Sequence, residues 1–69
     1  MIMQQKGYVA RIDYDEDDKL FRGKVANIRD TIVFVGRNPD ELERDFAEQL
    51  EFYFEVCEKR GKKPERLDH

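Results

Sequence analysis

The sequence has too few histidines, cysteines and glycines for most catalytic or metal-binding sites. Its single cysteine, Cys57, excludes an internal disulfide and is typical of a protein from a reducing cytoplasm. Its single histidine, His69, is the last residue, so we expect no histidine-based acid, base, nucleophile or zinc site. The four glycines are isolated and form no phosphate-binding loop. We therefore predict no enzyme activity, no catalytic residues, no cofactor and no metal.

Long apolar runs are also missing. Residues 1–8 contain no signal-peptide core, and no segment approaches the roughly 20 apolar residues of a membrane span. With 69 residues, the chain is expected to form one domain over residues 1–69, with a core over 7–61 and a frayed tail over 62–69. We predict a cytoplasmic protein that does not bind membranes.

The charges do not favour nucleic acid or a bound cation. Thirteen basic and sixteen acidic residues give a net charge of −3, so the whole molecule has no electrostatic attraction for DNA. Asp13, Asp15 and Asp17 alternate as at the start of a calcium loop. The sixth position, however, is Asp18 instead of glycine, and the twelfth is Lys24 instead of glutamate. We interpret this run as a charged hairpin turn.

A long amphipathic helix is predicted from Asn38 to Gly61. Asn38 is a good N-cap, Pro39 suits the first helical position, and Glu41 completes a capping box. Gly61 then favours a left-handed end to the helix. One apolar stripe is expected to face the core, and it contains Leu42, Phe46, Leu50, Tyr53 and Cys57.

Alternating residues predict three strands before this helix, at Gly7–Asp13, Lys19–Asn27 and Thr31–Val35. A turn at residues 15–18 would place Ala10 opposite Gly23 and Arg11 opposite Arg22. A second turn would place Val25 opposite Phe34. The predicted fold is α+β: a three-stranded antiparallel meander covered on one face by one long helix (β-β-β-α). Val9, Ile28 and Thr31 are among the residues expected on the other face.

Three groups of residues remain as candidate contact surfaces. Phe52 and Val56 project beyond the core stripe, next to acidic side chains, which favours a partner-binding patch of Glu48, Phe52, Glu55 and Val56. Val33 and Val35, on a possible edge strand, are candidates for self-association into a dimer. Arg11, Arg22 and Lys24 share the uncovered sheet face, where they could contact an anion or remain solvated.

The order of these features resembles the N-terminal domain of HicB-type antitoxins over about residues 7–65. The pattern there is Y-x-A, a D-x-D turn, L-F-x-G-x-V-x-N, R-D-x-I-x-F, and a helix that begins x-x-E-L and ends C-x-x-x-G-x-x-P. The residues at those places are Tyr8, Ala10, Leu20, Phe21, Gly23, Val25, Asn27, Arg29, Asp30, Ile32, Phe34, Glu41, Leu42, Cys57, Gly61 and Pro64.

The resemblance implies a partial RNase H-like fold without nuclease chemistry. It also implies that the protein binds and neutralises a HicA-like toxin, a small basic protein that cuts messenger RNA. The family commonly continues into a DNA-binding domain, whereas this chain stops at His69, so operator binding and autorepression are expected to be absent. Two alternatives stay open: an orphan homodimer with no toxin partner, and a weak nucleic-acid-binding module that uses the basic sheet face.

Overall fold

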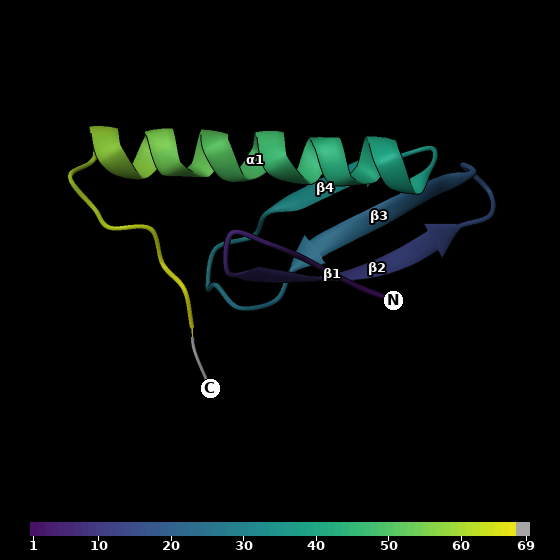
Figure 1. Ribbon diagram of the computed structural model, residues 1–69, viewed down its shortest axis with the longest axis horizontal. Coiled ribbons are helices and arrows are strands. Elements are labelled where there is room, and N and C mark those ends of the chain that lie inside the picture. Colours follow the sequence, from purple (N-terminus) through teal and green to yellow (C-terminus); the bar gives the residue numbers. More distant parts are fainter. Residues whose placement is uncertain (68–69) are drawn as a thin grey trace.

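Residues 1–67, which the computed structural model describes, form one antiparallel sheet and one long helix (Figure 1). The strands are β1 (Ile2–Gln5), β2 (Tyr8–Asp15), β3 (Leu20–Val25) and β4 (Val33–Gly36), and they lie in the order β1-β2-β3-β4. The helix, α1 (Pro39–Lys59), packs against one face of this sheet. The α+β meander with a covering helix is confirmed, but the prediction of three strands was wrong. His69 lies outside the described residues.

The missed strand, β1, is held by a tight turn at Lys6 and Gly7. Both turn residues have positive φ, 52° and 85°, as in the two-residue hairpin turns that match the twist of a sheet. Met3 is then opposite Ala10 and packs on the core, and the Gln5 side-chain amide donates to the Glu43 carbonyl at 2.8 Å. The two-residue turn and these two side-chain contacts therefore hold residues 2–5 in the sheet, although apolar and polar residues do not clearly alternate there.

Both predicted strand registers were wrong by two residues. The first hairpin loop is Glu16–Lys19, so Ala10 is opposite Val25, and Arg11 is opposite Lys24 instead of Arg22. Phe34 is opposite Gly23 instead of Val25. Because side chains alternate along a strand, a shift of two changes the partners but keeps every strand residue on its predicted face.

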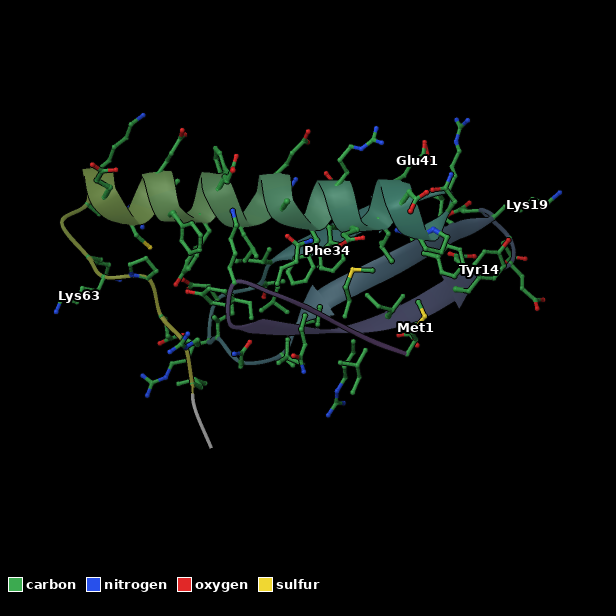
Figure 2. All side chains as sticks on the ribbon, viewed as in Figure 1. Met1, Tyr14, Lys19, Phe34, Glu41 and Lys63 are labelled. Atoms are coloured by element: carbon green, nitrogen blue, oxygen red, sulfur yellow. The ribbon has the colours of Figure 1, made fainter. Side chains whose placement is uncertain are left out.

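The core lies between α1 and the sheet. The rings of Phe34 and Phe46 stack with centroids 4.4 Å apart and planes 2° apart, and both side chains are fully buried (Figure 2 labels Phe34). Ile28 was expected on the uncovered face but is buried, because the chain leaves the sheet after Val25 and turns inward. The buried apolar residues are Tyr8, Ala10, Ile12, Val25, Ile28, Ile32, Phe34, Leu42, Phe46, Leu50 and Cys57.

Both ends of α1 agree with their sequence signals. The Asn38 side chain accepts the N–H of Glu41 at 2.9 Å, whereas the Glu41 carboxylate accepts the N–H of Arg37, one residue earlier than in a capping box. At the other end Gly61 has φ 68°, and the N–H groups of Gly61 and Lys62 donate to the carbonyls of Glu58 and Cys57. This pair of bonds is a Schellman motif, which ends the helix at the predicted place.

Residues 62–67 cross the end of the sheet instead of fraying. The Leu67 N–H donates to the Asn27 carbonyl at 2.7 Å, and the Glu65 N–H donates to the Tyr53 hydroxyl at 2.9 Å. The Glu65 carboxylate also contacts the Arg29 backbone N–H and guanidinium. These bonds join the segment after α1 to the connection between β3 and β4. The polar composition of residues 62–67 gives no sign of these contacts in the sequence.

Candidate partner-binding surface

A second stripe of α1 side chains lies on the side of the helix nearest β4. Asp45, Gln49, Phe52 and Val56 are spaced by 4, 3 and 4 residues, which places them in one line along a helix. The Asp45 carboxylate accepts the N–H of Val35 at 2.9 Å, so the line begins in contact with β4. Phe52 is 64 % exposed and Val56 is half-buried. The stripe is therefore polar where it touches β4 and apolar further along.

The outer edge of β4 presents backbone groups from alternate residues. The Val25 N–H donates to the Ile32 carbonyl, so Ile32, Phe34 and Gly36 direct their backbone groups toward β3. Val33 and Val35 must then direct theirs outward. Asp45 already binds the Val35 N–H, whereas the register leaves the Val33 N–H and carbonyl facing away from every other strand of the described chain.

A hollow of about 270 Å³ lies between this edge and α1. Phe52, Val56 and Gln49 line it from the helix, and Val33 and Thr31 line it from the β4 side. Val33 is itself 56 % exposed. The structure thus brings together two groups that the sequence placed apart, because Phe52 and Val56 of the partner patch share one hollow with Val33 of the self-association pair.

The other predicted members of these groups lie elsewhere on the same side. Glu48 is exposed and lines a separate shallow hollow with Val35, Arg37 and Arg44. Glu55 is exposed and lines neither hollow. Both glutamates therefore flank the apolar part of the stripe and leave its centre to Phe52 and Val56.

The uncovered sheet face carries the predicted basic group. Arg11 and Lys24 are direct cross-strand partners, both are exposed, and neither makes an ion pair within the described residues. They line a wide concavity of about 670 Å³ together with Val33 and Val35. Like charges directly opposite each other are unfavourable in a sheet, so an anion over this pair would relieve their repulsion.

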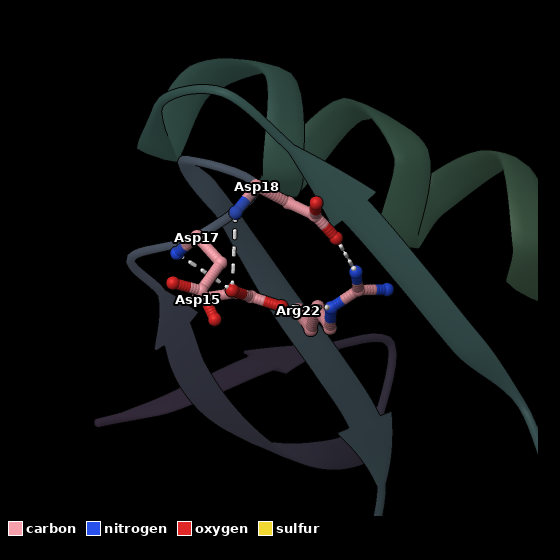
Figure 3. A network of polar contacts seen from close by, with 4 residues as sticks. All are labelled: Asp15, Asp17, Asp18 and Arg22. Carbon is pink, nitrogen blue, oxygen red and sulfur yellow. Dashed lines mark hydrogen bonds and ion pairs between the residues drawn. The ribbon is translucent and has the colours of Figure 1, made fainter.

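Arg22, the third basic residue, is held by the acidic hairpin turn (Figure 3). Its guanidinium contacts the Asp18 carboxylate at 2.7 Å and the Asp15 carboxylate at 3.4 Å. Asp15 also accepts the N–H groups of Asp17 and Asp18. The Asp18 N–H first, then that of Asp17 and the Arg22 side chain, lower the pKa of the Asp15 carboxyl below its ordinary value. Arg22 lines the same concavity as Arg11 and Lys24, but its guanidinium is already paired with the turn carboxylates.

Some residues of this surface were missed by sequence reasoning. Asp45 and Gln49 continue the helical line of Phe52 and Val56, so the same angular argument could have found them. Asp30 and Thr31 also line the hollow, but their place depends on the path of the chain between β3 and β4. No local sequence signal predicts that path.

The remaining findings are comparisons with known proteins and searches for a membrane span and a metal site. No protein-family model, curated protein or solved structure matches it. Within residues 1–67, no helix is long and apolar enough to cross a membrane. The same residues contain no group of three or more histidine, cysteine, aspartate or glutamate side chains placed to hold a metal ion.

Proposed function

We propose that this chain is a non-enzymatic HicB-like antitoxin module that binds and neutralises a HicA-like, mRNA-cleaving toxin in the cytoplasm. The observation that carries the proposal is the 64 % exposure of Phe52 on a capped helix, beside Val56. Rigid aromatic side chains surrounded by polar groups are typical centres of protein interfaces. Glu48 and Glu55 flank this centre, and their charge is complementary to a small basic toxin.

The resemblance to HicB-type antitoxins gains support from what its residues do in the fold. Gly23 leaves space for the ring of Phe34, and Gly61 forms the left-handed end of α1. The Asn27 side chain accepts the N–H of Val9 at 2.9 Å and donates to the Gly7 carbonyl at 3.1 Å. These residues maintain the fold on which Phe52 is exposed, so they support a shared fold. The proposed binding role rests on other residues, Glu48, Phe52, Glu55 and Val56.

The proposal is tested by co-expression in bacteria with HicA-like toxins, and with any small basic protein that a neighbouring gene encodes. We expect the wild-type chain to restore growth and to co-purify with the toxin. Replacing both Phe52 and Val56 with alanine should abolish rescue, because loss of an interface centre costs about 2 kcal/mol or more, roughly thirtyfold in affinity. Ile2→Ala is the matched control, since Ile2 is equally exposed, at 65 %, but lies on β1.

If no HicA-like protein binds the wild-type chain, the antitoxin proposal is withdrawn. The alternative is then an orphan homodimer that associates through Val33 and Val35. Both are exposed on the uncovered face, at 56 % and 40 %. Light scattering would give a dimer mass for the wild type, and replacing both valines with threonine, which keeps the side-chain shape, should yield monomers. A monomeric wild type at micromolar concentration would exclude the dimer.

A second candidate function is weak binding of RNA by the uncovered face. It is favoured by one observation, the cross-strand pairing of Arg11 with Lys24, neither of which makes an ion pair within the described residues. Two phosphate contacts would give a slope of about −1.5 in a plot of log affinity against log salt. Replacing Arg11 and Lys24 with glutamine should remove this slope, whereas Arg22→Gln should leave it because Arg22 is held by the turn. RNA binding that does not change with salt would contradict this reading.

A further inference from the structure

We propose that the hollow between α1 and β4 receives a short extended segment of a basic protein partner, which pairs with the backbone of Val33 as a fifth strand. This inference rests on the proposed partner-binding function and adds the mode of binding. Strand addition to an exposed sheet edge is a common mode of peptide recognition, in which backbone bonds give affinity and side-chain pockets give specificity. The edge of β4 offers both elements.

The backbone part of the site is short and has a defined end. The Val33 N–H and carbonyl point outward from the sheet, as the Val25-to-Ile32 bond requires. Beyond Val33 the next outward N–H, that of Val35, is already bound by Asp45 at 2.9 Å. An added strand can therefore pair at Val33 but must leave the sheet before Val35. Asp45 sets the register of the incoming segment.

The side-chain part of the site is apolar and faces the same opening. Phe52 and Val56 line the hollow from α1, and Val33 lines it from β4. A strand paired with Val33 would place every second side chain toward α1, where one apolar residue meets Phe52. Burial of Phe52, now 64 % exposed, would add to the backbone bonds.

Charge decides which occupant fits. Asp30 lines the hollow, and Asp45 and Glu55 flank it on the helix, whereas no lysine or arginine lines it. A second copy of this chain, with a net charge of −3, would bring the same acidic residues against each other across a symmetric β4–β4 contact. A basic segment with an apolar residue at its centre meets no such repulsion.

The test uses a short capped peptide in which lysine and valine alternate, at millimolar concentration, with the full chain. In the free protein the Val33 amide should exchange quickly with solvent, and the peptide should slow this exchange at least about tenfold. The Val35 amide is the internal control, since Asp45 binds it with or without peptide. An unchanged Val33 exchange rate would overturn the proposal. A glutamate–valine peptide that binds equally well would overturn its charge argument.

Val33→Pro gives a second, independent readout. Proline lacks the outward N–H, and edge strands tolerate proline where that N–H faces solvent. The variant should bind the lysine–valine peptide at least about fivefold more weakly, the factor typical of one hydrogen bond. Val33→Thr, which keeps the N–H, should bind as the wild type does. Equal peptide affinity of Val33→Pro and wild type would refute strand pairing.

The same variants separate this inference from the proposed function. A HicA-like toxin that binds wild type and Val33→Pro equally would keep the antitoxin proposal and remove strand addition. If the peptide protects the Val33 amide but no HicA-like toxin binds the chain, strand addition is kept and the antitoxin proposal is removed.

Discussion

Gly23→Ala should be among the most destabilising single-methyl additions in this protein. Gly23 is buried in β3 directly beneath the ring of Phe34. A Cβ atom there would lie 2.8 Å from Cε1 of Phe34 and still closer to two other ring atoms. The ring cannot retreat, because its other face is stacked on Phe46 with centroids 4.4 Å apart. One methyl group therefore displaces two core aromatics.

The expected loss follows from the cost of overpacking. Extra methyl groups in a well-packed core typically cost 1–3 kcal/mol, and the trapped ring places Gly23→Ala at about 3 kcal/mol. At roughly 0.05–0.15 kcal/mol per residue, the whole chain has about 3–10 kcal/mol of stability. Urea denaturation followed by circular dichroism should therefore show a large fall in the midpoint, or an unfolded variant at the small end of that range.

A double-mutant cycle distinguishes steric conflict from general weakening of the strand. Phe34→Leu should partly rescue Gly23→Ala, with a coupling of at least about 1 kcal/mol between the two changes. Gly61→Ala is the control, because no atom lies within 4 Å of the added methyl group and only its φ of 68° is unfavourable. It should cost about 1 kcal/mol and add independently to Phe34→Leu. A Gly23→Ala variant within about 0.5 kcal/mol of wild type, or strict additivity with Phe34→Leu, would refute the packing argument.

Three further predictions concern the polar contacts. The folded protein lowers the pKa of Asp15, so the stability from its ionised carboxyl is present above the unfolded pKa and is lost as pH falls through the lowered folded pKa. An NMR titration should place this pKa below the ordinary value of an aspartate side chain, and Asp15→Asn should remove this part of the acid dependence. Tyr53→Phe removes the acceptor of the Glu65 N–H and should speed amide exchange at Glu65, while unchanged exchange would mean that this bond does not hold the tail. Asn27→Ala leaves the Val9 N–H and the Gly7 carbonyl without their side-chain partner and should cost about 1–3 kcal/mol in urea denaturation, whereas a neutral effect would assign Asn27 no structural role.

The helix was predictable because its signals are local. Asn38 and Gly61 act on backbone groups within four residues of themselves, so the bounds of α1 can be deduced from a short window of sequence. The exposure of Phe52 follows from the same local geometry, since it depends only on the angle between Phe52 and the core stripe. Both inferences need no knowledge of the sheet.

The registers and β1 were not predictable by the same reasoning. The acidic run allows the first hairpin loop to begin at Asp15 or at Glu16, and both choices keep apolar residues on one face. The structure selects the second, in which Asp15 remains in β2 and its carboxylate organises the turn through the N–H groups of Asp17 and Asp18. The strand β1 depends on positive φ at Lys6, a residue type that gives little warning of such a turn.

For the candidate site, the residues could be predicted from the sequence, but the hollow that they share could not. The sequence identifies Phe52 and Val56 from the helix and Val33 from the strand, but the hollow between them depends on how α1 crosses β4. Asp45 determines that crossing through its bond to the Val35 N–H, a contact between residues on separate elements. Neither the capping pattern nor the strand alternation contains this information.

The difference in length between α1 and β4 explains why an apolar hollow exists at all. The 21 residues of α1 extend about 32 Å at 1.5 Å per residue, whereas the four residues of β4 extend only about 13 Å at 3.3 Å per residue. Asp45 lies beside the strand, but Phe52 and Val56 are two and three turns further along, where β4 has not yet begun and residues 26–32 form an irregular connection. A longer β4 would have covered these side chains with its own. The short strand therefore creates the opening, and an added strand of a partner is the element whose shape would complete it.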